Sequence, residues 1–582
     1  MLEFIAINMA PIMFASLIFF LLLGYPVAFS LAANGLVFFA IGVWLAPYSE
    51  GTITLDWALL GTMPQRVWGT MSNDTLLAIP FFTFMGIVLE RSGMAEDLLD
   101  TVGQLFGPIR GGLAYAVIIV GALLAATTGV VAASVIAMGL ISLPIMLRYG
   151  YDRRLASGVI AASGTLAQII PPSLVLIVLA DQLGRSVGDM YAGAIIPGLV
   201  LTGLYMAYIF IVSIVRPTWV PALPPEARTL GHGVTSLLVA IAVCIGIGYG
   251  AHVWLYPTQG ANADILGATV GVIVIYVYAV FDKSLKFNTM SRLAQQFIIV
   301  LIPPLALVFL VLGTIFLGIA TPTEGGAMGA LGAMVLAAMK RRLNFGVISQ
   351  ALSSTTRLSA FVMFILIGAR MFSLTFYGVN GHVWVEHLLV GLPGGQTGFL
   401  IIVSVLVFLL AFFLDFFELA FIIVPLLVAP AEALGIDLIW FGVILAVNMQ
   451  TSFMHPPFGF ALFYLRSVAP RSPYNDKVTG ERLAGVSTGQ IYWGAVPFVI
   501  IQVVMIGITI AFPQMVMHYK GTPVDPSSIE IKVPTLKPLA PGGATLGAPT
   551  LGAPKLGTPD AGGGTVAPTL PGPKLGAPVI NP

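Results

Sequence analysis

Two proline-broken stretches decide the fold: SGTLAQIIPPS (163–173) and NMQTSFMHPPFG (448–459). Each interrupts an apolar run with a proline pair, which removes amide donors and halts a helix. A Gly-x-Asp turn precedes each pair by the same distance, at 150–152 and at 435–437, so one pattern recurs after about 285 residues. The sequence predicts two helices that are each broken at the middle of a membrane.

Composition places these stretches in a polytopic membrane protein. Of the 582 residues, 58% are hydrophobic and 9% are charged, whereas a soluble domain is about 25% charged. At roughly 20 apolar residues per crossing, the chain up to residue 515 has room for a dozen spans. The 26 basic residues are scattered and form no basic face, which argues against nucleic-acid binding. A single cysteine, Cys244, excludes a disulfide framework and a cysteine-based metal site.

Apolar runs between charges and Gly or Pro breaks give the predicted crossings. We expect full spans near 4–23, 27–46, 74–89, 155–180, 191–215, 235–256, 264–281, 294–318, 324–339, 358–377, 438–465 and 489–512. The first of these is read as a retained span, because the N-terminus has no basic region and no cleavage site. Two longer runs, 113–147 and 397–429, carry polar or glycine residues at their middle and are predicted to be re-entrant hairpins.

Charge supports this layout. With the N-terminus outside, most of the 26 basic residues fall on inner segments, and before residue 515 only Arg66 and Arg185 lie on outer loops. If either long run were a single crossing, every later segment would change sides, and the basic residues would no longer gather on the inner side. With the spans at 235–281 set aside, five crossings and a hairpin lie on each side, and an odd number of crossings inverts the second copy. The predicted fold is an all-α polytopic membrane protein with inverted repeats, two re-entrant hairpins and two broken helices.

This layout divides the chain into six predicted parts. They are scaffold and arm helices (1–112), a first transport repeat with hairpin 113–147 and broken helix 155–180 (113–215), a cytoplasmic loop with an extra two-span insert (216–293), second scaffold and arm helices (294–396), a second transport repeat with hairpin 397–429 and broken helix 438–465 (397–512), and a Pro/Gly-rich tail (520–582). The tail repeats Leu-Gly-Ala-Pro and holds almost no aromatic residues, so we expect it to be disordered and periplasmic.

Four motifs resemble one family. They are NDTLLAIPFFTFMGIVLERSGM (73–94), GTLAQIIPPS (164–173), GIATPTEGGAMGALGA (318–333) and NMQTSFMHPPFGFALFYLRSVAP (448–470). Together they resemble the large membrane subunit (M, DctM-type) of TRAP transporters. The resemblance implies an elevator-type transporter of the ion-transporter superfamily in a bacterial inner membrane, driven by Na+. It also implies two partners, a small four-helix membrane subunit and a periplasmic substrate-binding protein that delivers an organic acid.

Two features refine the resemblance. The family's first hairpin tip usually reads like Ser-Gly-Ser-Ser, whereas residues 127–130 here read Thr-Thr-Gly-Val, with two hydroxyls. The stretch at 448–466 looks like the branch whose binding proteins resemble binders of 2-oxo acids and lactate, which favours a small monocarboxylate.

The predicted substrate contacts lie at the breaks and hairpin tips. Ser173, Thr128 and Thr165 offer hydroxyl donors where half-helix N-termini point at an anion; ordinary helix-to-helix hydrogen bonds are the alternative. Asp415 lies at the second tip, where an ionisable residue is functional by default. It either contacts the substrate, accepting a hydroxyl or fixing a donor, or caps a helix.

Na+ is a hard cation that prefers oxygen ligands. The predicted ligands form three clusters: Thr127, Ser163, Gly164 and Thr165; Asn448, Gln450 and Thr451; and Thr321 with Thr323. His455 is either a packed residue or a proton-coupling group. An intramembrane hydrolase using Asp415 and Glu418 is one alternative function, although paired acids need a water-access groove for general acid/base work. A passive channel or a scaffold subunit is the other, and neither of these two needs an inverted pair of broken helices.

Overall fold

The computed structural model describes residues 2–520, except 130, 232, 260–262, 413, 458 and 477. The predicted tail therefore lies outside the described residues beyond Lys520. The described chain is helical apart from one short hairpin, in which β1 (Tyr474–Asn475) pairs antiparallel with β2 (Arg482–Leu483). Within these ranges nine helices are long and apolar enough to cross a membrane, or ten if one bent pair counts as a span. The protein is an all-α polytopic membrane protein.

The helices of the first half follow the predicted order. They are α1 (Leu2–Ile7), α2 (Met9–Leu22), α3 (Val27–Leu45), α4 (Trp57–Leu60), α5 (Met63–Met71), α6 (Ala78–Arg91), α7 (Met94–Phe106), α8 (Gly112–Thr128), α9 (Val131–Arg148), α10 (Arg153–Thr165), α11 (Leu174–Gln182), α12 (Val187–Val215), α13 (Val234–Gln259) and α14 (Ala263–Leu285).

The second half continues this order. Its helices are α15 (Arg292–Phe316), α16 (Pro322–Met339), α17 (Phe345–Gly378), α18 (Gly381–Val390), α19 (Gly395–Leu410), α20 (Phe416–Glu418), the π-turn η6 (Leu419–Ile423), α21 (Val424–Ala433), α22 (Leu438–Gln450), α23 (Phe460–Val468), α24 (Thr488–Ala511) and α25 (Gln514–Met517).

Both predicted spans with proline pairs are broken helices. α10 ends at Thr165, passes through the 3-10 turn η2 (Leu166–Gln168), and the chain resumes as α11 after Ser173. α22 ends at Gln450, passes through η7 (Thr451–Phe453), and resumes as α23. Asp152 and Asp437 cap α10 and α22 in the same way, each side chain accepting two backbone N–H groups. Local chemistry therefore starts and stops the two helices alike.

The predicted hairpins are also helix pairs with a break between them. The run 113–147 forms α8 and α9, separated at Gly129, which has a positive φ of 58°. The run 397–429 forms α19 and then α20, η6 and α21 as its second arm. A Cβ on Gly129 would lie 3.4 Å from Leu174 Cγ. The first tip thus packs against the start of α11.

Two predicted spans differ from the observed helices. The span 4–23 is divided at Asn8, whose Nδ2 donates to the Phe4 carbonyl at 2.9 Å. An asparagine side chain that bonds to nearby backbone competes with the helix. The span 358–377 is the last part of α17, which begins earlier because Asn344 accepts the Val347 amide at 2.9 Å as its N-cap. The prediction missed this start because it followed apolar runs, and the first residues of α17 are partly polar. A helix can extend beyond the apolar layer of the membrane.

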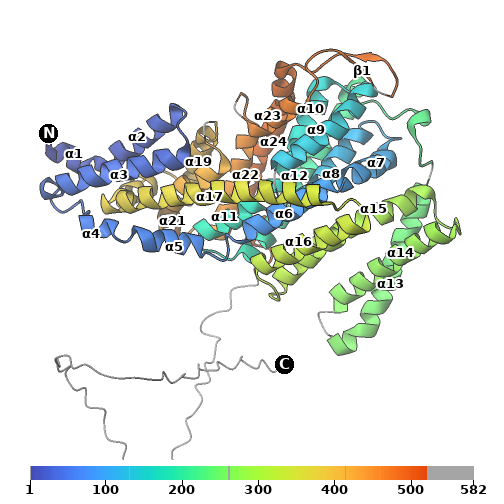
Figure 1. The fold of residues 1–582 in the computed structure, drawn as a ribbon, viewed down its shortest axis with the longest axis horizontal. Coiled ribbons are helices and arrows are strands. Elements are labelled where there is room, and N and C mark those ends of the chain that lie inside the picture. The colour runs from blue at the N-terminus through green and yellow to red at the C-terminus, as the bar shows by residue number, and fades with distance from the viewer. Residues whose placement is uncertain are drawn as a thin grey trace, which may run out of the picture. The chain divides into compact units, whose positions relative to one another are not determined.

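Helices from the two halves of the chain pack in crossed pairs. α3 packs along the long helix α17, and α6 packs along α16 (Figure 1). At the first contact a Cβ on Gly35 would lie 2.9 Å from the Met371 backbone. α10 packs on α24, where a Cβ on Gly158 would lie 2.0 Å from the Gly494 carbonyl oxygen. The predicted two-span insert is the helix pair α13 and α14, which adjoins α15 (Figure 1).

Candidate functional site

A hydrogen bond joins the two helix breaks. Gln450 Nε2, at the end of α22, donates to Thr165 Oγ1, at the end of α10, at 3.1 Å across 285 positions of sequence. Both side chains are fully buried. The sequence placed these residues in two separate cation clusters, and the structure brings the clusters together.

Two further polar residues complete this junction. Gln502 of α24 donates from Nε2 to Tyr205 OH of α12 at 3.0 Å, and the same nitrogen lies 3.5 Å from Thr165 Oγ1. Gln502 and Tyr205 are also fully buried. Neither residue was singled out from the sequence. A signal existed for Gln502, because it is a lone amide in the apolar run FVIIQVVMIG (498–507).

Several amide oxygens near the breaks have no donor. Within the described ranges, Oδ1 of Asn448 and Oε1 of Gln168, Gln450 and Gln502 are buried without a hydrogen-bond partner. A buried acceptor without a donor costs about 1–3 kcal/mol. Oxygen atoms of this kind suit a hard monovalent cation better than they suit an apolar ligand.

The other predicted cation residues flank the junction. Ser163 Oγ donates back to the Ile160 carbonyl at 3.0 Å, and Thr451 Oγ1 donates to the Asn448 carbonyl at 2.6 Å. Asn448 Nδ2 donates to the Ser404 carbonyl of α19 at 2.7 Å, which ties the second hairpin to α22. A Cβ on Gly164 would lie 2.4 Å from Val135 Cγ2, so this glycine lets α9 approach α10 closely.

Ser173 stands at a buried helix N-terminus. Its Oγ accepts the amides of Val175 and Leu176 at 3.2 and 3.4 Å, and donates to the Gln168 carbonyl at 2.6 Å. The side chain is fully buried. The residue therefore caps α11 and closes the loop across the break, at the positive end of the helix dipole of α11.

Asp415 is a helix cap. Its Oδ1 accepts the Glu418 amide at 2.9 Å, and Glu418 Oε2 accepts the Asp415 amide at 3.0 Å, which is a reciprocal capping box at the start of α20. The sequence allowed either a substrate contact or a helix cap for Asp415, and the geometry shows the helix cap. Each acid uses one oxygen in this way, so contact with a substrate by Asp415 stays a prediction.

Two predicted residues have side chains outside the described part of the chain, and a third, Thr321, lies at another helix start. The side chains of Thr127 and Thr128 lie outside the described residues, although the backbone places both at the end of α8. Thr321 is exposed and caps α16, in a capping box with Glu324. It is held by local bonding at the end of a helix that packs on α6 and α15.

His455 packs against the second hairpin. Its ring is stacked on Phe412 with centroids 4.1 Å apart and meets Phe408 edge-on at 4.3 Å. The side chain is 1% exposed, and in the described part of the chain neither ring nitrogen has a hydrogen-bond partner. The imidazole thus packs the loop after η7 against α19 and the residues that follow it. This is the packed role, one of the two alternatives that the sequence left open for His455.

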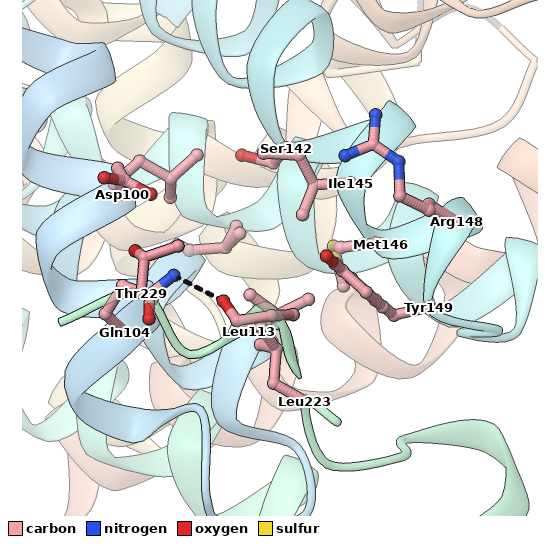
Figure 2. A pocket seen from close by; sticks show the side chains of 14 residues that line it. Asp100, Gln104, Leu113, Ser142, Ile145, Met146, Arg148, Tyr149, Leu223 and Thr229 are labelled. Carbon is pink, nitrogen blue, oxygen red and sulfur yellow. Dashed lines mark hydrogen bonds between the residues drawn. The ribbon is translucent and has the colours of Figure 1, made fainter. Parts of the chain in front are cut away.

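A separate cavity of about 220 Å³ lies between α7, α8, α9 and the segment 223–229 (Figure 2). Asp100, Ser142 and Thr229 line it, and Gln104 Nε2 donates to the Ala227 carbonyl at 3.0 Å at its side (Figure 2). None of the residues lining it belongs to the predicted substrate or cation sets. The candidate site is therefore the junction of the breaks.

Helices broken around buried polar groups define a class of membrane protein, the transporters with discontinuous helices. Within that class, residues 14–515 match the family model described as "Tripartite ATP-independent periplasmic transporter, DctM component". The chain belongs to this family, as its motifs indicated. It is a multi-pass transporter subunit and not an enzyme, which removes the hydrolase alternative.

Curated relatives agree with this assignment. The chain is 28% identical to the C4-dicarboxylate TRAP transporter large permease protein DctM of Pseudomonas aeruginosa, over 69% of this chain and 79% of the relative. It is 24% identical to the ectoine TRAP transporter large permease protein TeaC of Halomonas elongata, over 88% and 99%. The solved Alcanivorax borkumensis YdaH transporter matches 83% of this chain and 98% of that chain, with 14% identity and a TM-score of 0.47.

Proposed function

We propose that this subunit imports a small organic acid together with Na+ across the bacterial inner membrane. A periplasmic binding protein delivers the substrate, and a small four-helix membrane subunit completes the permease. The observation that carries the proposal is the buried contact between Thr165 and Gln450, where two broken helices meet beside amide oxygens that have no donor among the described residues.

The cations bind at the ends of α10 and α22. A helix C-terminus carries partial negative charge and free carbonyls, and Asn448, Gln450 and Gln502 add amide oxygens at the same depth. Backbone carbonyls from η2 and η7 supply further ligands. Na+ tolerates such mixed oxygen sets, whereas a transition metal needs nitrogen, sulfur or carboxylate ligands.

The substrate binds at half-helix N-termini. The start of α11 at Ser173 is the positive end of a buried helix dipole, which favours a carboxylate. Named substrates of the relatives include C4-dicarboxylate, isethionate and ectoine, all small organic molecules with an acidic group. A small carboxylate such as a 2-oxo acid or lactate fits this chemistry.

Transport proceeds by an elevator movement. The parts 113–215 and 397–512 form inverted repeats that carry the substrate, and they move as one body against the scaffold parts 1–112 and 294–396. Support comes from the matched capping and breaks of α10 and α22 and from the crossed packing of α3 with α17 and of α6 with α16.

The test is uptake in proteoliposomes that hold this chain, its small partner and the binding protein. Accumulation against a gradient should require inward Na+. Thr165→Val removes the acceptor of Gln450, and losing a buried hydrogen bond should raise the Na+ concentration for half-maximal uptake about tenfold. Ser467→Ala, at an exposed site on α23, is the matched control and should leave it unchanged. Accumulation driven by protons alone, or mere equilibration of substrate, would reject the proposal.

A further inference from the structure

A short loop before α6 bonds to two different parts of the protein through adjacent residues. Asn73 Nδ2 donates to Asp181 Oδ1 at 2.7 Å, in the last turn of α11. The carbonyl of Asp74, the next residue, accepts from Thr323 Oγ1 in the first turn of α16. One residue of the loop thus contacts a broken helix, and its neighbour contacts a helix packed on α6.

Asn73 is oriented for its contact. Its Oδ1 accepts the amides of Thr75 and Leu76 at 2.9 and 3.4 Å, which fixes the side chain and turns Nδ2 toward Asp181. On the other side, Asp181 Oδ2 accepts Gln182 Nε2 at 2.8 Å. The asparagine and the aspartate are both half-buried. A hydrogen bond to a carboxylate in such a setting is stronger than one between neutral groups.

The position of this bond matters because of what α11 carries. Asp181 lies at the outer end of α11, and Ser173 lies at its buried end beside the junction. Under the proposed function, α11 belongs to the moving part, while Asn73, Asp74 and Thr323 belong to the scaffold. The bond from Asn73 must break when the moving part slides, and the bond between Asp74 and Thr323 must persist.

We propose that Asn73 and Asp181 form an outer latch that holds the moving part in the state seen here. The inference rests on the proposed elevator function. It assigns Asn73 and Asp181 a role in setting the balance between states, not in binding substrate. Removing a hydrogen bond to a charged acceptor should shift that balance about tenfold toward the other state.

Cross-linking tests the latch with a control built into the same loop. In a Cys244→Ser background, which removes the native cysteine, one chain carries Asn73→Cys with Asp181→Cys and another carries Asp74→Cys with Thr323→Cys. Each is treated with a short thiol-reactive cross-linker that a reductant cleaves. The first pair should lose uptake when linked and recover it on reduction. The second pair should keep uptake. Normal uptake by the linked first pair would overturn the latch.

Distance measurements separate failure of the latch from failure of the proposed function. Spin labels at Gln65→Cys and Asp189→Cys, both exposed, report the separation of α5 from α12 by pulsed electron paramagnetic resonance. We expect two label-to-label distances, the first from the state seen here and the second from the other state. Asn73→Ala should raise the population with the second distance, relative to that with the first, about tenfold. An unchanged ratio overturns the latch while Na+-driven uptake stands. If Asn73→Ala changes the relative populations of the two distances but the protein shows no Na+-driven uptake, the latch stands and the proposed transport mechanism is rejected.

Discussion

At the scale of the single residue, Asp415 separates a structural role from a substrate contact. Asparagine is as good an N-cap as aspartate, whereas alanine loses the cap at a cost of about 1 kcal/mol. As a cap for α20, Asp415→Asn should keep both uptake and thermal stability near the wild type, and Asp415→Ala should lower the melting temperature. Uptake kinetics and thermal unfolding of the two purified variants check this. Loss of uptake by Asp415→Asn at unchanged stability would instead place the carboxylate in contact with the substrate.

Thr165 and Gln450 of the junction could be chosen from the sequence, but their contact could not. Thr165, Asn448 and Gln450 are polar positions in apolar helices beside proline pairs, which is a local signal. The bond between Thr165 and Gln450 spans 285 positions and depends on how the two halves pack. Tyr205 gave no signal, because tyrosine is common at the ends of membrane helices and the sequence around it does not mark it as buried.

At the scale of the element, the crossing of α10 and α24 depends on two glycines. A Cβ on Gly158 would lie 2.0 Å from the Gly494 carbonyl oxygen, whereas a Cβ on Gly507, in the same helix α24, would meet nothing within 4 Å. Gly158→Ala should therefore force the helices apart and destabilise the protein by about 1–3 kcal/mol. Gly507→Ala should be neutral or stabilising, since alanine favours a helix.

Thermal unfolding of the two glycine variants in the same detergent measures this difference. Equal melting temperatures would show that α10 and α24 are not held at the distance seen here.

The two helix breaks were the elements that the sequence predicted best, because each is caused by residues adjacent in the chain. Proline pairs follow the ends of α10 and α22, and Asp152 and Asp437 cap the starts of these helices. Helix ends outside the apolar layer were predicted poorly. The start of α17 at Phe345 depends on the Asn344 cap rather than on hydropathy.

At the scale of the whole molecule, an ion pair joins the two halves of the chain. Arg148, at the end of α9, bonds through Nε and Nη2 to both carboxylate oxygens of Asp476 at 2.9 Å. The side chains are 16% and 2% exposed. Asp476 also accepts the amides of Val478 and Thr479 within its own loop, at 3.1 and 2.8 Å. A loop of the second half is thereby fixed to the base of the first hairpin.

The ion pair between Arg148 and Asp476 predicts that the stability of the protein depends on pH. The hydrogen bonds from Arg148 hold the pKa of the Asp476 carboxyl well below its usual range, despite burial. Because the folded-state pKa is lowered, the stabilisation is fully present above the unfolded pKa of about 3.9, and it is lost as pH falls through the folded value. Asp476→Ala should cost about 2–3 kcal/mol at pH 7, and its deficit should shrink below about pH 4.

Glu481, exposed on the same loop, supplies the control for this prediction. Glu481→Ala should change stability by less than about 0.5 kcal/mol at any pH. Unfolding in detergent between pH 7 and pH 3 compares the two variants with the wild type. A deficit of Asp476→Ala that stays constant as pH falls would mean that the loop is held by packing, and that Arg148 and Asp476 do not bind the halves into one moving body.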